Sequence, residues 1–171
     1  LRIALAALNV KSGDEVIMPA NSFVATALAA TGVGAKPVLV DCDRHSYMID
    51  PNAVGAAITP RTKVIIPVHL MGLMADMDAI NTLAAKHNLH VVEDAAQSQG
   101  ATYKNKKSGS MGIIGCTSFY PTKNLGAYGD AGAITTNDAA LAMKMNLLRN
   151  YGQEKKYHHI VQGLNCRLDT I

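Results

Sequence analysis

The sequence has few charged residues and no long hydrophobic run, and each of these absences excludes a class of protein. Charged residues make up 17% of the 171 residues and hydrophobic residues 49%, which is typical of one folded domain with a substantial core and unlike disordered chains. No apolar run reaches the ~20 residues of a membrane span. Arg2 and Lys11 interrupt the apolar N-terminal stretch without a cleavage pattern, so we expect neither a membrane span nor a signal peptide.

Cysteine is also scarce. Only Cys42, Cys116 and Cys166 are present, widely spaced and without a CxxC pair. This pattern excludes a disulfide framework. We expect buried, reduced thiols in a cytoplasmic protein.

Several chemical fingerprints are missing. The sequence has no GxGxxG or GxxxxGK[ST] phosphate-binding motif and no GxSxG nucleophile elbow. His69, His158 and His159 suggest a metal site at first sight. However, His158 and His159 are adjacent, a spacing that suits ligation from neither a helix nor a strand, and no Cys or Asp cluster accompanies them. We therefore expect no metal.

Positive charge is only in slight excess, with a formal net charge of +3. The densest basic cluster consists of Lys104, Lys106 and Lys107, and we expect it at the tip of a solvated hairpin. A nucleic-acid surface needs a basic patch, so we expect no nucleic-acid partner.

Short apolar runs alternate with segments of helical spacing along the whole chain. Strands are expected at 15–18, 37–40, 63–68, 90–93, 116–120 and 133–135, with 37–40 buried. Helices are expected at 1–8, at 23–30 after an Asn21-Ser22 cap, from the Asp50-Pro51 start, at 76–86, and from Asn137-Asp138 to Leu148. This alternation predicts an α/β fold with three α/β/α layers and a mostly parallel sheet.

The loop from Ser118 to Gly132 is the most informative stretch. An apolar run breaks at Pro121, and a single lysine, Lys123, follows inside a glycine-rich loop. Loops at strand ends carry the chemistry of α/β proteins. A partly desolvated lysine there can lose its proton and attack a carbonyl carbon, although a surface lysine in a β-turn explains this stretch alone equally well.

Asp94 directly follows an expected buried strand. A carboxylate in that position needs a cation or hydrogen-bond donors. Asp94 either caps a following helix or holds a protonated ring nitrogen, as pyridoxal phosphate (PLP) requires because its protonated ring is the electron sink. Gln97, one helical turn further on, either binds the same ligand or is a solvated helix residue.

Ser118 and Phe23 complete the candidate site, and each has an ordinary alternative. The Ser118 hydroxyl either donates to a phosphate or satisfies a nearby backbone group. Phe23 either stacks on a flat ring or packs its own helix. Because ligands of such folds bind beyond the carboxyl ends of the strands, Asp94 and Lys123 are expected at the same rim. Lysine, aspartate and serine there predict a Schiff-base cofactor site.

The motifs are more specific in combination than one by one. Together they closely resemble the DegT/DnrJ family of sugar aminotransferases, in the fold type I PLP superfamily, over nearly the whole chain. The motifs that carry the resemblance are Gly13-Asp14-Glu15-Val16-Ile17-Met18-Pro19, Phe23-Val24-Ala25-Thr26, Pro67-Val68-His69-Leu70-Met71-Gly72, Glu93-Asp94-Ala95-Ala96-Gln97, Ser118 to Gly132, Arg149-Asn150-Tyr151-Gly152 and Asn165-Cys166-Arg167-Leu168-Asp169.

The resemblance implies a role for each candidate residue. Lys123 matches the lysine that forms the Schiff base with PLP and later moves the proton. Asp94 matches the partner of the ring nitrogen, and Gln97 the residue that bonds the ring hydroxyl. Ser118 matches a phosphate ligand, and Phe23 an aromatic ring placed against the cofactor.

Asn165 matches the family's asparagine that reaches the phosphate in the neighbouring subunit. The resemblance therefore implies a homodimer with shared active sites.

The implied reaction is amino transfer from an amino acid, usually glutamate, to a nucleotide-linked keto sugar in polysaccharide, lipopolysaccharide or antibiotic sugar biosynthesis. The Tyr157-His158-His159 stretch is similar to members that act on 3-keto sugars. Two alternatives remain: a PLP-dependent dehydratase or lyase, which Lys123 disfavours because such members carry histidine there, and a non-catalytic regulatory or scaffold protein.

Both ends of the sequence suggest a piece of a longer protein. It begins at Leu1 inside an expected helix and stops at Leu168-Asp169-Thr170-Ile171, where an apolar pattern is starting. The resemblance implies that residues 1–171 are a partial large domain, without an N-terminal phosphate-binding segment and a C-terminal small domain. We expect this piece alone to be a poor or inactive catalyst.

Overall fold

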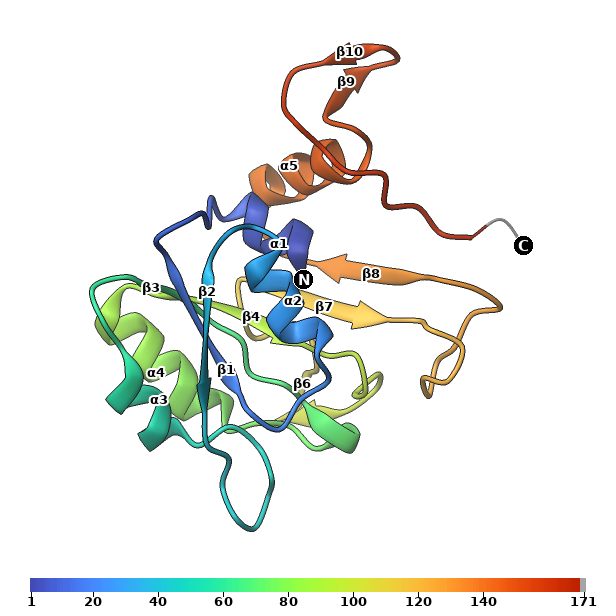
Figure 1. Ribbon diagram of the computed structural model, residues 1–171. Helices are drawn as coiled ribbons and strands as arrows, with labels where there is room; N and C mark the ends of the chain where they lie inside the picture. Colours follow the sequence, from blue (N-terminus) through green and yellow to red (C-terminus); the bar gives the residue numbers. More distant parts are fainter. Residues whose placement is uncertain (170–171) are drawn as a thin grey trace.

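The computed structural model describes residues 1–169. Thr170 and Ile171, part of the apolar pattern expected at the end of the chain, lie outside the described residues. Six strands form the central sheet in the order β2-β1-β3-β4-β7-β8 (Figure 1). Their bounds are β1 Glu15–Pro19, β2 Lys36–Val40, β3 Thr62–Ile65, β4 His90–Asp94, β7 Ile114–Ser118 and β8 Gly132–Thr135. All neighbours are parallel except β8, which is antiparallel to β7, so the predicted mostly parallel sheet is confirmed.

Helices cover both faces of this sheet, as the three-layer prediction requires. The first face carries α1 (Arg2–Ala7), α2 (Ala25–Thr31) and α5 (Ala139–Arg149). The second face carries α3 (Pro51–Ala57) and α4 (Met77–His87). Smaller elements are the 3-10 turn η1 (Leu70–Gly72), the hairpin β5–β6 (Thr102–Tyr103, Lys106–Lys107) and the hairpin β9–β10 (Gln153–Lys155, His158–His159).

The core forms two apolar layers because successive strand residues point to opposite faces. Val16 and Met18 of β1 pack with α1 and α2, whereas Ile17 packs with α3 and α4. Each fully buried aliphatic side chain of this kind contributes roughly 1.5–3 kcal/mol. These layers hold the strand ends, and therefore the loops beyond them, in fixed positions.

Aspartate caps begin three of the helices. The Asp50 carboxylate accepts from the Asn52 amide at 2.8 Å, and Asp76 and Asp138 serve α4 and α5 in the same way. The expected Asn21-Ser22 cap is wrong. Helix α2 begins at Ala25, no side chain caps it, and the Ser22 hydroxyl instead bonds the Thr26 hydroxyl at 2.7 Å.

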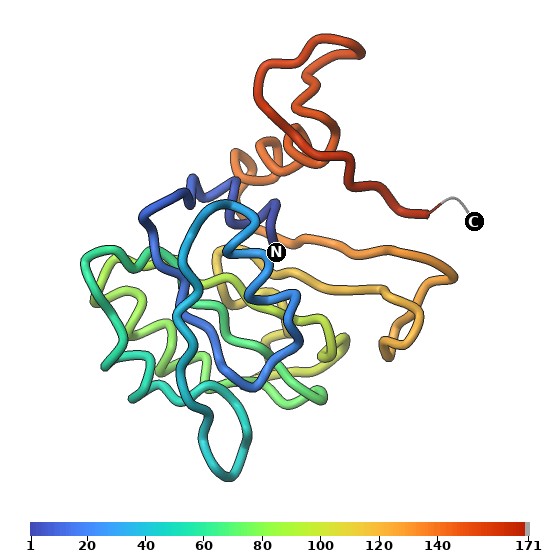
Figure 2. Tube along the Cα trace, viewed as in Figure 1, coloured from blue at the N-terminus to red at the C-terminus, as the bar shows by residue number. Residues whose placement is uncertain are grey.

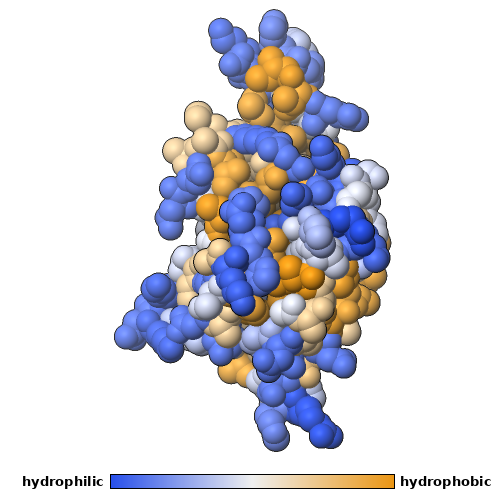
Figure 3. Space-filling view, turned by 90° about the vertical axis from the view of Figure 1, so that its left-hand side faces the viewer, coloured by the Kyte–Doolittle hydropathy of each residue, from blue (hydrophilic) through white to orange (hydrophobic). Residues whose placement is uncertain are grey.

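Two expectations about burial are also corrected. Strand β2 is the outermost strand and pairs only with β1, so Leu39 is 59% exposed where a buried strand was expected. Figure 3 looks at the molecule from the left-hand side of Figure 1, and apolar areas lie there between projecting hydrophilic side chains. Of the cysteines, Cys116 is buried and Cys42 half-buried, but Cys166 is exposed.

The chain beyond α5 leaves the sheet and then returns to it. Hairpin β9–β10 stands away from the body, and the following segment runs back along the β8 side (Figure 2). The Cys166 amide donates to the Arg149 carbonyl at 2.9 Å, and the Asp169 amide donates to the Asp130 carbonyl at 3.1 Å. Among the described residues, no helix is long and apolar enough to cross a membrane.

Candidate active site

The candidate residues gather at the carboxyl ends of two neighbouring strands. Asp94 is the last residue of β4 and Ser118 the last of β7. The two strands are paired, with Asp94 opposite Cys116. Gln97 lies in the turn after β4, and Lys123 in the turn after β7. The structure therefore brings the turns that carry Asp94, Gln97, Ser118 and Lys123 to one edge of the sheet.

Asp94 is buried, 6% exposed, on the face that α2 covers. Its carboxylate accepts a hydrogen bond from the Thr26 hydroxyl at 2.9 Å and from the Ala96 amide at 3.2 Å. Both donors are neutral, and within residues 1–169 no ion pair involves Asp94. A turn follows β4, so the alternative that Asp94 caps a helix is wrong. Its carboxylate is left with its negative charge uncompensated, which favours a cationic ligand.

Thr26 is a site residue that sequence reasoning missed. It belongs to the same short motif as Phe23, but its bond to Asp94 spans 68 residues. No local pattern marks such a contact. The only signal in the sequence was a hydroxyl residue within an expected helix. The structure shows that this residue lies on the buried side of the helix, where it is 2% exposed.

Gln97 is held by a backbone amide. Its side-chain oxygen accepts from the Met71 amide at 2.8 Å. Because an N–H can only donate, this contact identifies the oxygen and leaves the Gln97 NH₂ group pointing elsewhere. The expected helical turn between Asp94 and Gln97 is wrong, since the chain forms turns there. Gln97 nonetheless keeps the N–H donors of its side chain, three residues beyond Asp94.

Lys123 is half-buried in a tight turn. Its amide donates to the Tyr120 carbonyl at 2.8 Å, and no hydrogen bond or ion pair of its ammonium group exists within the described part of the chain. The turn depends on Gly126, because a Cβ atom there would lie 2.5 Å from the Pro121 carbonyl oxygen. The loop thus presents a lysine that is neither tied to a carboxylate nor fully solvated.

Ser118 and Phe23 flank this edge. The Ser118 hydroxyl accepts from the Tyr120 amide at 3.2 Å and keeps its own proton for a further acceptor. Phe23 is 70% exposed, which rules out helix packing as its role and leaves an aromatic face at the rim. Gln99, not considered from the sequence, fixes the end of β7 by donating to the Ser118 carbonyl at 2.8 Å.

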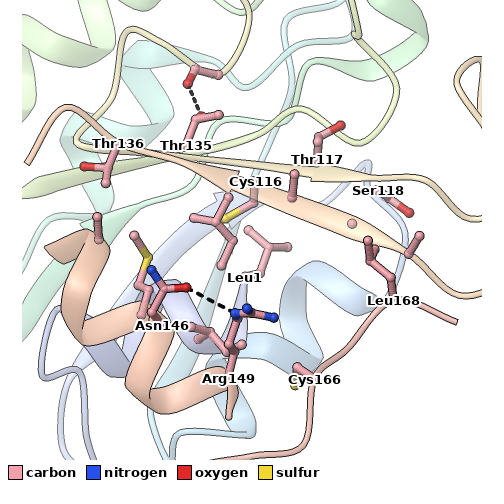
Figure 4. Close-up of a pocket in the computed structure, with 18 of the residues that line it drawn as sticks. Leu1, Cys116, Thr117, Ser118, Thr135, Thr136, Asn146, Arg149, Cys166 and Leu168 are labelled. Carbon is pink, nitrogen blue, oxygen red and sulfur yellow. Dashed lines mark hydrogen bonds between the residues drawn. The ribbon is translucent and has the colours of Figure 1, made fainter. Parts of the chain in front are cut away.

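A groove of about 1300 Å³ runs between β8, α5 and the segment after β10. Ser118 and Asn165 both line it, and Asn165 pairs with Asn150 as an isolated bridge. Figure 4 shows Ser118 and Arg149 on two sides of this groove, with the Arg149 guanidinium bonded to Asn146 at 3.1 Å. Polar side chains from distant parts of the chain therefore converge beside the end of β7.

On the opposite face, Glu93 forms a buried cluster that the sequence did not reveal. Its carboxylate accepts four hydrogen bonds and is 0% exposed. The donors are the His69 ring at 2.9 Å and the amides of Gly109 at 2.9 Å, Met111 at 2.6 Å and Gly112 at 2.6 Å. Burial alone would raise the pKa of Glu93, but these donors outweigh it and hold the pKa below its usual value. Glu93 is therefore a buried carboxylate whose two oxygens both accept hydrogen bonds from groups of the chain itself.

The fold and the residues at this edge of the sheet identify the class of protein: the chain has the fold of fold type I aminotransferases. Two solved structures illustrate this. Streptomyces venezuelae DesV, in complex with a ketimine intermediate, superimposes with a TM-score of 0.95 at 48% identity over 98% of this chain and 45% of that one. NtdA from Bacillus subtilis, with bound cofactor PMP, gives a TM-score of 0.90 at 42% identity over 96% of this chain and 38% of that one.

The family follows from the sequence match. The chain belongs to the DegT/DnrJ/EryC1/StrS aminotransferase family, whose model matches residues 1–171. A curated relative, the UDP-2-acetamido-2-deoxy-3-oxo-D-glucuronate aminotransferase of Pseudomonas aeruginosa, is 54% identical over all of this chain and 48% of its own length. The chain thus spans about half the length of the curated relatives it matches.

Proposed function

We propose that the whole protein is a PLP-dependent aminotransferase that moves an amino group from an amino acid, with glutamate as the expected donor, to a nucleotide-linked keto sugar. The observation that carries the proposal is that Asp94, a buried carboxylate with neutral donors, ends β4, and that the half-buried Lys123 lies in the loop after the neighbouring strand β7. The relative that is named for a 3-oxo sugar substrate supports a 3-keto sugar as the acceptor.

The residues at this edge fit PLP. A cationic ring nitrogen would supply the charge that Asp94 lacks, since its two donors, Thr26 and Ala96, are neutral. The Gln97 NH₂ group would donate to the oxygen of the hydroxyl group on the ring. The Ser118 hydroxyl would donate to the phosphate of the same copy, and Phe23 offers an aromatic face. For Asn165 we propose that the phosphate belongs to a second copy of the protein, in a homodimer.

When bound, PLP supplies an electron sink for the carbon that loses or gains the amino group. Asp94 would stabilise the protonated ring nitrogen that makes the sink effective. Lys123 would hold the cofactor and would serve as the general base and acid that moves a proton during the transfer. The buried position of Asp94 strengthens its charge interaction, because water screens it less.

The test uses the visible absorption of the whole protein with PLP. We expect a yellow band that borohydride bleaches, that Lys123→Ala abolishes, and that glutamate converts to the pyridoxamine form. The matched control is Lys106→Ala, which removes an exposed lysine of hairpin β5–β6 and should leave the band unchanged.

Three results separate the alternatives. A reducible band that survives Lys123→Ala would show that the nucleophile is misassigned. A Lys123-dependent band that glutamate leaves unchanged favours a lyase or a scaffold protein. With a functional glutamate half-reaction, a panel of nucleotide-linked 3-keto and 4-keto sugars identifies the acceptor.

A further inference from the structure

His69 forms a clamp beneath the candidate site. Its ring is 0% exposed and lies between two partners. One ring nitrogen, Nε2, is 2.9 Å from the Glu93 carboxylate, and the other, Nδ1, is 3.2 Å from the Ala75 amide nitrogen. The ring therefore connects the end of strand β4 to the far end of the loop that follows His69.

The two partners determine where the proton of this ring lies. The Ala75 amide can only donate, so Nδ1 must accept. The proton therefore sits on Nε2, which donates to the ionised Glu93. His69 in this arrangement is neutral, and a doubly protonated ring would oppose the Ala75 N–H with a second N–H.

The loop that begins at His69 contacts two residues of the candidate site, Asp94 and Gln97. The His69 amide donates to the Asp94 carbonyl at 3.0 Å. Two residues further on, Met71 adopts a left-handed conformation with φ of 54°, which costs free energy for a residue other than glycine. Its amide donates to the Gln97 side chain at 2.8 Å. A strained backbone thus provides the contact that orients Gln97, and the buried His69 lies at the base of the same loop.

We propose that His69 is a positioning residue for the cofactor site. Its neutral ring, clamped between Glu93 and Ala75, holds loop 69–75 so that the Met71 amide fixes Gln97 with its NH₂ group toward the cofactor. The part of this proposal that concerns the cofactor rests on the proposed function. The clamp itself does not, because it consists only of contacts within the chain.

The main experiment is a double-mutant cycle on PLP affinity in the whole protein. His69→Ala and Gln97→Ala should each weaken PLP binding by about threefold to tenfold, the effect of one lost hydrogen bond. If His69 acts through Gln97, the double variant is no weaker than Gln97→Ala alone. The two single variants should also shift the visible band of bound PLP in the same direction, because one removes the Gln97 donor to the ring hydroxyl and the other leaves that donor misplaced.

The matched control is Ile80→Val, which trims a buried side chain of α4 in the apolar cluster that loop 69–75 also joins but leaves both hydrogen bonds of the His69 ring in place. It should lower thermal stability and leave PLP affinity and the band position unchanged. If His69→Ala does not fold, His69→Gln takes its place in the cycle, since it keeps a donor for Glu93 but loses the acceptor for the Ala75 amide. Fully additive effects in the cycle overturn the proposal.

A measurement without PLP separates this proposal from the proposed function. ¹⁵N NMR of the cofactor-free protein should show the Nε2–H tautomer of His69, and His69→Ala should shift the side-chain amide resonances of Gln97. If the wild-type protein binds no PLP, the proposed function fails while these two results still support the clamp. An Nδ1–H tautomer, or unchanged Gln97 resonances, overturns the clamp whether or not PLP binds.

Discussion

Glu93 and Asp94 are neighbours in one strand, yet their surroundings have little in common. Glu93 points to the face of α3 and α4 and receives four hydrogen bonds in a site closed to solvent. Asp94 points to the face of α2 and receives two from within residues 1–169, both from neutral groups. The comparison shows how strand alternation separates two uses of a buried carboxylate. The protein satisfies one carboxylate internally to build its loops, and leaves the other with a charge that a ligand can neutralise.

Among the variants that test this difference between Glu93 and Asp94, Glu93→Gln should cause the largest loss of stability. One Glu93 oxygen accepts from Met111 and Gly112, and the other from His69 and Gly109. An amide NH₂ group would therefore face two N–H donors in either orientation. We expect a loss of about 3–5 kcal/mol in the free energy of unfolding, as for other broken buried pairs, measured by urea denaturation. A loss below about 1 kcal/mol would contradict the buried role.

Asp94→Asn should have the opposite effects, with a small loss of stability and a large loss of PLP affinity. Its stability should change by less than about 1.5 kcal/mol, because an amide can still accept from Ala96 while the Thr26 hydroxyl rotates to accept from the NH₂ group. Loss of the charge should weaken PLP binding by about tenfold to a hundredfold. Spectroscopic titration with PLP measures this, and unchanged affinity would count against Asp94 as the ring partner.

Thr26→Val tests the link between α2 and the site. The variant keeps the shape of the side chain and removes the donor to Asp94. We expect a loss of about 1 kcal/mol in unfolding free energy and a change of a fewfold in PLP affinity. Ser22→Ala serves as the control, because it removes the outer partner of Thr26 and leaves Asp94 its donor.

The smallest effect on PLP binding should come from Glu15, a third carboxylate, which lies at the amino end of β1 and so at the opposite end of the strands from Asp94. Hydrogen bonds from Thr59 and Arg61 hold the pKa of Glu15 at about 2. Because its pKa is lower in the folded state, Glu15 contributes stability that is complete above about pH 4.5 and is lost as the pH falls toward 2. Glu15→Gln should flatten this part of the curve of melting temperature against pH, without affecting PLP binding.

Much of the fold follows from local sequence patterns. Apolar runs predicted every strand of the sheet, and Asp50, Asp76 and Asp138 cap helices that the spacing predicted. The edge position of β2 was not predictable, because strand order depends on contacts between distant segments.

The candidate site, like the fold, was predictable only in part. Lys123 and Asp94 stand out because their residue types are unusual at strand ends. The contacts that orient the site were not predictable, since Thr26 reaches Asp94 across 68 residues and Met71 reaches Gln97 across 26. Such pairs leave no periodic pattern in the sequence.

The reversed direction of β8 has a consequence for Lys123. In a wholly parallel sheet, the chain leaving β7 would have to cross to the opposite edge before the next strand could begin. Because β8 is antiparallel, residues 119–131 instead form a hairpin loop, with Ser118 opposite Gly132 at its base. The lysine is therefore anchored on both sides by one ladder of hydrogen bonds. Its loop can change length or sequence without altering the order of the strands, so the position of the lysine can vary independently of the sheet that supports it.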